Sequence, residues 1–362
     1  MFERISPREP DPQRPGCLYP NLDEGKQATG VGLCFTPRRG RGVILICCVC
    51  GSERYRVLFE GKDRLLGTPG TFPVVRCEDC GLLFIHPQPD SETLKKYYPE
   101  EYHAPRPILF REYRRLRKRV MEAFYGYGEP PSLMRSWSLL PFKGRYKNAV
   151  RFTKNGRLLD IGCGNGTELY KLKKMGWEVF GVETDEDAAA RARGVGLDVR
   201  TGDLFQAHYP DQFFDVVRLS FVLEHLPNPK ETLLEVKRIL RPRGRVYISI
   251  QNARSLHYWL FGRCWFSLDV PRHLFSFSTE TIQRFLNSLD LRIKKIQFDS
   301  GTRSFLGSLQ YCLNEWYDER GRVSRNEPFL TSHFLRHVVQ PICWLVDRLR
   351  LGDLIHVEIE KS

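Results

Sequence analysis

The chain has 362 residues, 41% of them hydrophobic and 27% charged, which is the composition of a soluble globular protein. No apolar run approaches the roughly 18 residues of a membrane span, and the first residues lack the apolar core of a signal peptide, so we expect a cytoplasmic protein without a transmembrane segment. The formal net charge is +13, and eleven cysteines in a cytoplasmic chain indicate metal binding or free thiols rather than disulfides.

Residues 1–42 are rich in Pro, Gly and Arg and lack periodicity, so we expect a disordered extension. An ordered unit is predicted over residues 43–103, and it contains two Cys-x-x-Cys pairs, each followed by a glycine that permits a tight turn. Four thiolates at this spacing form a closed tetrahedral site, which predicts a zinc ribbon with a structural metal. The predicted ligands are Cys47, Cys50, Cys77 and Cys80, with Cys48 as a weaker substitute, and redox use of the pairs is the alternative.

Most of the positive charge lies in residues 106–157, which hold fourteen Lys and Arg against three acids. Apolar residues recur there at helical spacing from Leu109 through Tyr113 to Phe124, so the arginines are predicted to share a helix with an apolar stripe. One interpretation is a solvated helix face. The other is contact with an anionic partner, which would be a phosphorylated substrate, an acidic membrane surface or RNA.

A glycine-rich turn follows a short apolar strand and precedes a helical pattern. Gly162, Gly164 and Gly166 alternate in it, and Asp160 comes just before them. Dinucleotide sites space their glycines differently, and a carboxylate would repel a pyrophosphate. The same carboxylate suits a ligand that carries an ammonium and a sulfonium group, such as S-adenosylmethionine (SAM). Glu183 ends the next strand, where a ribose-binding acid is expected.

This turn resembles the first motif, D/E-x-G-x-G-x-G, of the class I SAM-dependent methyltransferases. Later segments match the same family: a third strand ends in G-D-L, a fourth is followed by E-H-x-x-x-P, and L-x-P-x-G precedes a fifth. The resemblance implies an α/β fold with a Rossmann-like seven-stranded sheet. It also implies that Asp203 accepts a hydrogen bond from the adenine amino group and that Leu204 packs on the ring. The implied cofactor residues are Asp160, Gly162, Cys163, Gly164, Gly166, Glu183, Thr184, Asp203, Leu204 and Leu219.

The ribbon and the segment after it, L-x-F-x-x-P-x-P with a Tyr-rich turn, resemble bacterial methyltransferases with an N-terminal zinc ribbon, including sugar C-methyltransferases. D-x-P-R-H-L-x-x-F-S, at residues 269–278 of this chain, recurs in these enzymes. The resemblance covers about residues 44–362. It implies a methyltransferase domain over 104–362, with a helical insertion at about 303–350.

Glu224 and His225 follow the fourth predicted strand, and ligands of open α/β sheets bind at the carboxyl ends of the strands. His225 is therefore a candidate general base. In quinone-type O-methyltransferases a similar Glu-His pair holds a divalent cation, which is an alternative, and a capping or packing role is another. His273 is a second candidate base, and Arg272 a candidate clamp for phosphate or carboxylate, with core or capping duty as the alternative for both residues. Val222 stands where the sugar enzymes have a tyrosine.

Two further segments are predicted to bound the substrate site. An aromatic loop that includes Trp259, Trp265 and Phe266 is predicted to form a lid, with these rings free to meet a sugar face or a lipid chain. The apolar helical segment 334–346 is predicted to pack against the body of the protein. Closure of the substrate site and contact with a membrane surface are the alternatives for that segment.

These features predict a SAM-dependent methyltransferase that acts on oxygen or carbon of a small or lipid-linked anionic acceptor, of saccharide type. The alternative is an RNA methyltransferase that grips phosphates with the ribbon and the basic helix. That helix lacks exposed aromatic residues between its arginines, so we expect weak, salt-sensitive RNA binding. A non-enzymatic SAM-binding or RNA-binding module is a third hypothesis, against which the intact SAM motifs argue.

Overall fold

The structure is a computed structural model that describes residues 35–38, 41–98, 115–129, 132–319 and 332–361. The described residues all belong to one compact unit, which begins at Leu33. Leu109 and Tyr113, which start the predicted apolar stripe, and residues 1–34 of the predicted extension lie outside the described residues. None of the described helices is long and apolar enough to cross a membrane.

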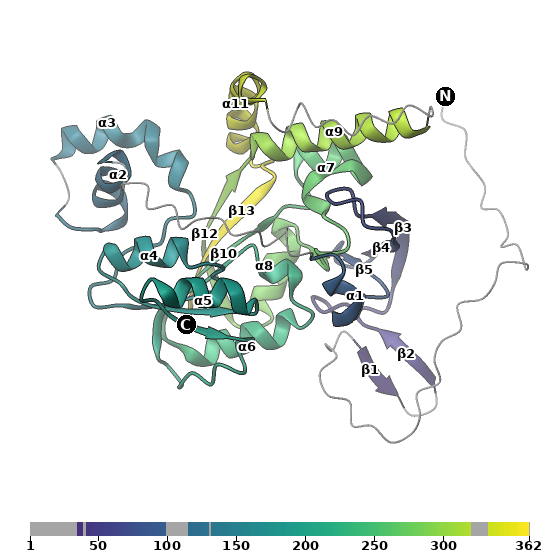
Figure 1. Cartoon of the computed structure of the whole chain (residues 1–362), viewed down its shortest axis with the longest axis horizontal. Helices are drawn as coiled ribbons and strands as arrows, with labels where there is room; N and C mark the ends of the chain where they lie inside the picture. The colour runs from purple at the N-terminus through teal and green to yellow at the C-terminus, as the bar shows by residue number, and fades with distance from the viewer. Residues whose placement is uncertain (1–34, 39–40, 99–114, 130–131, 320–331, 362) are drawn as a thin grey trace, which may run out of the picture. The chain divides into compact units, whose positions relative to one another are not determined.

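A seven-stranded sheet forms the centre of the fold, with strand order β12-β13-β10-β9-β6-β7-β8 (Figure 1). β13 runs antiparallel to both its neighbours, and the pairs from β10 to β8 are parallel. The predicted α/β fold with a Rossmann-like seven-stranded sheet is confirmed. The strands are β6 (Arg157–Ile161), β7 (Glu178–Glu183), β8 (Asp198–Thr201), β9 (Phe214–Ser220), β10 (Leu240–Gln251), β12 (Leu291–Asp299) and β13 (Leu354–Lys361).

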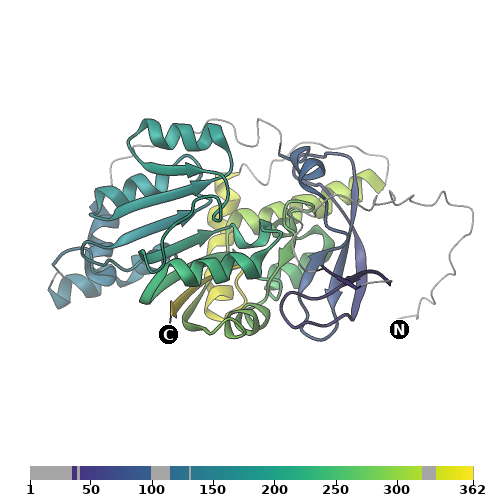
Figure 2. The ribbon, with the colours of Figure 1, turned by 90° about the horizontal axis from the view of Figure 1, so that it is seen from below.

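Helices cover both faces of this sheet (Figure 2), because parallel strands need crossover connections. Consecutive strand residues alternate between two hydrophobic clusters: Leu158 and Val216 pack with one set of helices, and Leu159 and Val217 with the other. The first set comprises α2 (Arg115–Tyr125), α3 (Leu133–Lys143), α4 (Thr167–Lys174) and α5 (Glu186–Gly194). The second comprises α6 (Pro229–Ile239) and α8 (Thr279–Asn287).

The cysteine-rich segment folds as a small antiparallel sheet, which a strand from much later in the chain completes. Its strands are β3 (Tyr55–Lys62), β4 (Thr71–Cys77) and β5 (Leu83–Ile85), and α1 (Ser91–Lys95) follows them. The short strand β11 (Phe275–Ser276) pairs with β5, so the sheet order is β11-β5-β4-β3. Phe84 and Phe275 belong to the same hydrophobic cluster as the central sheet. The ribbon and the central sheet therefore share one core.

The remaining elements are an N-terminal hairpin, the helices of the segment predicted to be a helical insertion, and the short helices of the aromatic loop. β1 (Phe35–Arg38) and β2 (Arg41–Leu45) pair as a hairpin, whereas we expected disorder throughout residues 1–42. Helices α9 (Thr302–Glu319) and α11 (His333–Arg348) lie within the segment predicted as an insertion. The aromatic loop forms α7 (Leu256–Phe261) and the 3-10 turns η3 (Gly262–Cys264) and η4 (Phe266–Leu268).

Candidate functional site

The glycine turn lies at the carboxyl end of β6, between β6 and α4. A Cβ atom on Gly162 would lie 2.6 Å from Val222 Cγ2, and one on Gly166 would lie 2.4 Å from Leu197 Cδ1, so packing alone requires these two glycines. Gly164, with φ of +55°, faces open space, because a Cβ there would meet no atom within 4 Å. Gly164 is therefore the glycine that leaves room for a ligand.

Glu183 ends β7 beside this turn and binds it. Its Oε2 accepts a 2.7 Å hydrogen bond from the Gly164 amide, and its Oε1 accepts a 3.0 Å hydrogen bond from the amide of Asp185. Thr184 Oγ1 lies 3.4 Å from Glu183 Oε1. The carboxylate is half-buried, so it holds the turn while part of it stays accessible.

Asp160 is buried at the end of β6, with 4% of its surface exposed. Its Oδ2 receives a 3.2 Å hydrogen bond from the guanidinium of Arg218 on β9, but within the described part of the chain its Oδ1 has no hydrogen-bond partner. Burial raises the pKa of this carboxyl to about 6, against the opposing effect of the Arg218 charge. An orphaned buried carboxylate oxygen next to an open glycine fits a cationic ligand.

The other predicted cofactor residues lie along the same edge of the sheet. Leu219 pairs in register with Ile161 and is fully buried, and Cys163 packs against Gly181. Asp203 is exposed and accepts a 2.8 Å hydrogen bond from the Gln206 amide. Leu204 is only 3% exposed, whereas its neighbour Phe205 is 43% exposed.

A cavity of about 260 Å³ lies between α2, α4 and Arg218. Glu168, in the first turn of α4, binds Arg117 at 2.6 Å on one side of it. Burial would raise the pKa of Glu168, but the positive charges of Arg117, Arg218 and Lys171 hold it at about 2. The cavity is close to the lower size limit of small-ligand sites, which is roughly 300 Å³.

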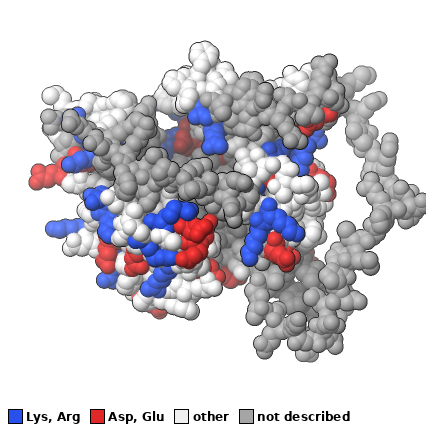
Figure 3. Space-filling view, viewed as in Figure 1, with Lys and Arg blue, Asp and Glu red and all other residues white. Residues whose placement is uncertain are grey.

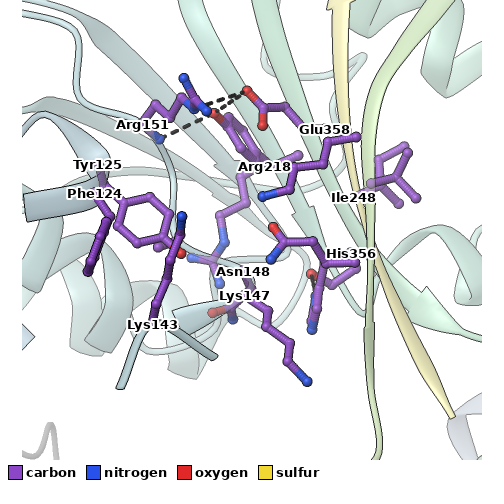
Figure 4. Close-up of a pocket in the computed structure, with 16 residues that line it drawn as sticks. Phe124, Tyr125, Lys143, Lys147, Asn148, Arg151, Arg218, Ile248, His356 and Glu358 are labelled. Carbon is purple, nitrogen blue, oxygen red and sulfur yellow. Dashed lines mark hydrogen bonds and ion pairs between the residues drawn. The ribbon is translucent and has the colours of Figure 1, made fainter. Parts of the chain in front are cut away.

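A second, smaller cavity of about 30 Å³ is also lined by Arg218 (Figure 4). Basic side chains surround it, and Arg151 points towards Glu358, with 3.8 Å between Nε and the carboxylate. Ser249 Oγ lies 2.8 Å from His356 Nδ1 in its wall. This volume holds about two water molecules, so it is too small for a cofactor.

Glu224 and His225 lie just past β9 in the 3-10 turn η2 (Leu223–His225). Glu224 is completely buried: its Oε1 accepts a 2.8 Å hydrogen bond from Gln251 Nε2, while its Oε2 has no partner among the described residues. Burial raises the pKa of Glu224. The structure brings His273 to the same place, since its ring centroid lies 4.6 Å from that of His225.

The two histidines share one hydrogen-bonding pattern. His225 Nδ1 lies 2.9 Å from the Arg272 carbonyl oxygen, and His273 Nδ1 lies 2.8 Å from the Ser267 carbonyl oxygen. A carbonyl oxygen only accepts, so each Nδ1 carries the proton and each Nε2 is left as the proton acceptor. Burial lowers the pKa of both rings, so both are neutral at neutral pH. One ligand atom from each histidine and one from Glu224 lie within 4.8 Å of one another.

Arg272 is not available as a ligand clamp, contrary to the sequence-based expectation. It is 1% exposed and forms ion pairs with Asp63 of the ribbon at 2.7 Å and with Asp269 at 2.6 Å. Its Nη1 also donates to the Tyr97 carbonyl oxygen at 3.1 Å. Both carboxylates neutralise the guanidinium inside the protein, so Arg272 joins the ribbon to the catalytic part.

The aromatic loop is not a free lid, because much of it is interior. Trp265 is 1% exposed and donates from Nε1 to Asp353 at 2.5 Å, so the prediction of a free Trp265 is wrong. Phe266 is half-buried and packs on Tyr311, with 5.4 Å between ring centroids. Trp259, by contrast, is 78% exposed. The buried carboxylate of Asp353, 88 residues from Trp265, holds this loop in place, and the composition of the loop did not indicate this contact.

The four predicted zinc ligands lie together. Cys47 Sγ is 3.6 Å from Cys80 Sγ, Cys50 Sγ is 3.6 Å from Cys77 Sγ, and all four sulfurs lie within 4.8 Å of one another. Tetrahedral zinc with Zn–S bonds of about 2.3 Å separates its sulfurs by about 3.8 Å, so the cluster fits this ion. Hydrogen bonding from Cys80 lowers the pKa of Cys47 to about 5, whereas burial raises that of Cys50 to about 11. The cluster could therefore hold a metal ion, and Cys48 is outside the group.

Sequence reasoning missed three residues of the site: Arg218, which binds Asp160; Gln251, which binds Glu224; and Tyr98, whose Oη lies 3.2 Å from His225 Nδ1. An arginine inside the buried strand Phe214–Ser220 was a usable signal, because a buried charge needs a partner. Nothing local linked Tyr98 to His225, which is 127 residues away.

A family model described as a methyltransferase domain matches residues 109–296. A ubiquinone biosynthesis O-methyltransferase from Aeromonas salmonicida is 34% identical over 110 residues, which are 28% of this chain and 46% of that protein. A protein of the same name from Hydrogenovibrio crunogenus is 27% identical over 160 residues, 42% of this chain and 64% of that protein. The chain thus spans less than two thirds of the length of these relatives. A SAM-dependent methyltransferase structure from Archaeoglobus fulgidus is 24% identical and covers 62% of this chain and 92% of its own, with a TM-score of 0.39, too low to carry an argument.

Proposed function

Since this chain belongs to the family of methyltransferase domains, we propose that it transfers a methyl group from SAM to an acceptor at the carboxyl edge of its seven-stranded sheet. The observation that carries the proposal is the cradle formed by Asp160, Gly164 and Glu183. A turn that is open at Gly164 and held by Glu183 stands beside a buried carboxylate oxygen without a partner. These features leave room for SAM and match its positive charge.

The chain's own residues would hold the cofactor by charge and hydrogen bonding. When bound, SAM supplies a methyl group on a positively charged sulfur. Asp160 would offset positive charge on the amino-acid end, and the cavity beside Arg218 would receive part of that end. Glu183 would bind the ribose hydroxyls with its accessible oxygen, and Asp203 the adenine amino group.

We further propose that His225 Nε2 removes the proton of the acceptor. The neutral imidazole takes the hydroxyl proton as the acceptor oxygen bonds to the methyl carbon and the bond from that carbon to sulfur breaks. The Arg272 carbonyl fixes the ring through Nδ1, which keeps Nε2 basic and in place. His273, whose ring is oriented in the same way, is the second candidate for this role.

A divalent cation at Glu224, His225 and His273 is a second candidate for this centre. The buried Glu224 Oε2 lacks a partner in the described part of the chain. Each histidine donates its Nδ1 proton to a backbone carbonyl, which is the usual arrangement of a metal-binding histidine. Two imidazoles and one carboxylate suit a divalent transition metal. Such an ion would lower the pKa of an acceptor hydroxyl. If this ion is needed, a mild chelator that leaves the four-cysteine site filled, as metal analysis would verify, should abolish activity, and added Mn²⁺ should restore it.

The acceptor that these features support best is a small molecule methylated on oxygen. The related proteins named ubiquinone biosynthesis O-methyltransferase favour a small acceptor, and the ribbon's likeness to sugar methyltransferases favours a saccharide-type or lipid-linked one. The RNA alternative loses support from the basic segment, because Arg117, Lys147 and Arg157 are bound to acids of the same chain.

The test is SAM binding, measured by calorimetry, in a Gly164→Arg variant. The arginine would fill the open space at this turn, so we expect no detectable binding. Gly196→Arg is the matched control, because Gly196 also has a positive φ, +78°, and no atom within 4 Å of a Cβ, but it precedes β8 at the opposite edge. Unchanged affinity in Gly164→Arg, or equal losses in both variants, would contradict the proposed cofactor site.

A further inference from the structure

Helix α11 has two apolar faces, only one of which packs against the protein. Val339, Cys343 and Val346 are buried, and the first two pack on Leu306 of α9. The outer face is exposed along the whole helix. It consists of Phe334 (75% exposed), Val338 (53%), Ile342 (52%), Leu345 (53%) and Leu349 (60%).

These five residues are spaced four, four, three and four apart, so they form one continuous stripe. A surface helix normally needs one apolar stripe, which faces the core, and α11 already has that stripe. Large exposed apolar patches on a soluble domain mark sites of interaction. Uncharged side chains cover α11 at the top of the molecule in Figure 3.

The charges beside the stripe identify the partner. The only acid in α11 is Asp347, which Lys147 binds at 2.6 Å, so no free acid faces outwards from the helix. Arg348 and Arg350 are exposed, and the Arg348 guanidinium lies 3.8 Å from the centre of the Trp344 ring. An apolar stripe with arginines and a tryptophan at its border is typical of helices that lie in the interface of an anionic membrane.

Helix α3 repeats these features on the same side of the molecule (Figure 1). Met134 and Trp137 are 86% and 73% exposed, and the helix contains no acid. A groove of about 1420 Å³ extends between Gly144, which caps α3, and the arginines at the end of α11. Two separate helices therefore present exposed apolar side chains, and the single acid that they contain, Asp347, is paired with Lys147.

We propose that the outer face of α11, assisted by α3, docks this protein on an anionic phospholipid bilayer. The stripe enters the boundary between headgroups and acyl chains, and Arg348 and Arg350 bind lipid phosphates. A second copy of this chain is disfavoured, because the outer face of α11 carries no free acid that could pair with Arg348 and Arg350 of the other copy. The docking surface is independent of the methyl-transfer chemistry proposed above.

The experiment is flotation of the full chain with phosphatidylcholine vesicles that do or do not contain phosphatidylglycerol. We expect binding to the anionic vesicles and little binding to the neutral ones. The triple variant Phe334→Ser, Ile342→Gln and Leu345→Gln should bind at least about ten-fold more weakly, because three side chains that would enter the apolar layer are lost. Leu234→Gln is the matched control, because Leu234 lies on α6 and is 45% exposed. It should bind like the unmodified protein.

A second variant tests the charges without touching the stripe. Arg348→Gln with Arg350→Gln should weaken binding by about five-fold per arginine, and added salt should remove the difference. Absence of binding by the unmodified protein, or undiminished binding by the triple variant, would overturn the proposal. Self-association in the absence of lipid that the triple variant abolishes would assign the surface to a second copy and also overturn it.

Discussion

The cofactor side and the acceptor side of this site are built in different ways. Asp160, Gly164 and Glu183 belong to one strand-turn-helix-strand unit, in which Glu183 accepts a hydrogen bond from the Gly164 amide. From outside this unit, the side chain of Arg218 binds Asp160. Glu224 and His225 meet His273 through the 269–278 segment, which pairs with β5 of the ribbon and whose Leu274 amide donates to the Glu224 carbonyl oxygen. The cofactor side is built within one local unit of the chain, whereas the acceptor side depends on the ribbon being folded. SAM binding and methyl transfer to the acceptor should therefore be separable by substitution.

Loss of the ribbon metal should have the largest effect, because methyl transfer should be lost while SAM binding remains. We expect Cys47→Ser with Cys77→Ser to lose the ion, unfold the ribbon and abolish methyl transfer, because metal binding contributes about 10 kcal/mol or more to such folds. SAM affinity should change little. Metal analysis, calorimetry and hydrogen exchange of the β3–β5 amides measure these outcomes.

Cys48→Ser is the control for this pair, because Cys48 stands outside the four-sulfur group and its replacement should leave the metal in place. A metal-free protein with an ordered ribbon would refute the zinc hypothesis. Loss of SAM binding together with the ribbon would show that the two sides are not separable.

The buried ion pair between the ribbon and the catalytic part should be the next most sensitive point. Asp63→Asn removes one carboxylate from Arg272, and breaking a buried pair costs about 3 kcal/mol or more in the free energy of unfolding. Glu280→Gln is the control, because its pair with Arg254 is exposed and should be worth less than about 1 kcal/mol. Denaturant unfolding measures both, and similar losses in the two variants would contradict the role given to Arg272.

Replacement of the proposed base should act on the acceptor side alone. His225→Ala should reduce methyl transfer by about 10²-fold, the usual contribution of a general base, while SAM affinity stays the same. His208→Ala, at an exposed position outside the site, should have no effect. Labelled SAM with a set of phenolic and saccharide acceptors provides the assay. Full activity in the His225 variant would move the base to His273.

The smallest expected effect is the pH dependence of SAM binding. Asp160 has a pKa of about 6 without ligand, so its charge is lost as the pH falls below that value. Affinity for SAM should fall roughly ten-fold between about pH 7 and pH 5. In the unliganded protein the sign is opposite: a raised carboxyl pKa favours the fold at low pH, and this contribution disappears as the pH rises through about 6.

Asp160→Asn provides the comparison for this profile. It should bind SAM weakly at every pH and give a flat curve between about pH 5 and pH 7, because the group that titrates there is gone. A steep profile that survives the substitution would assign the titration to another residue.

Much of the fold could be predicted because its signals are local. The seven strands and most helices follow from apolar runs and caps, such as the capping box of Ser278 and Thr281 at the start of α8. The four-cysteine cluster was also predictable, since each Cys-x-x-Cys pair places two of the four sulfurs close together. The turn at residues 241–244 was predicted, but the structure extends β10 through it to Leu240, with a register shift against β9.

Arg272 and Trp265 show why the rest was not predictable. As exposed residues, Arg272 would suit an anion and Trp265 would suit a sugar. Instead, Arg272 binds Asp63, which is 209 residues away, and Trp265 binds Asp353, which is 88 residues away. A sequence does not show which buried acid will meet a polar side chain, because that depends on how distant segments pack. The exposed outer face of α11 is a similar case, since its pattern alone favoured packing against the body.

The sequence by itself determined the α/β architecture, the glycine turn with its two acids, and the set of four cysteines. Each of these is built from short local patterns, such as the glycine turn and each Cys-x-x-Cys pair, in which backbone geometry leaves little choice. Only the tertiary structure decided that Glu224, His225 and His273 form one cluster, that Arg272 is internal, and that α11 leaves an apolar face uncovered. These outcomes follow from contacts over more than 40 residues, such as the one between His225 and Arg272, and packing energy rather than local conformation selects such contacts.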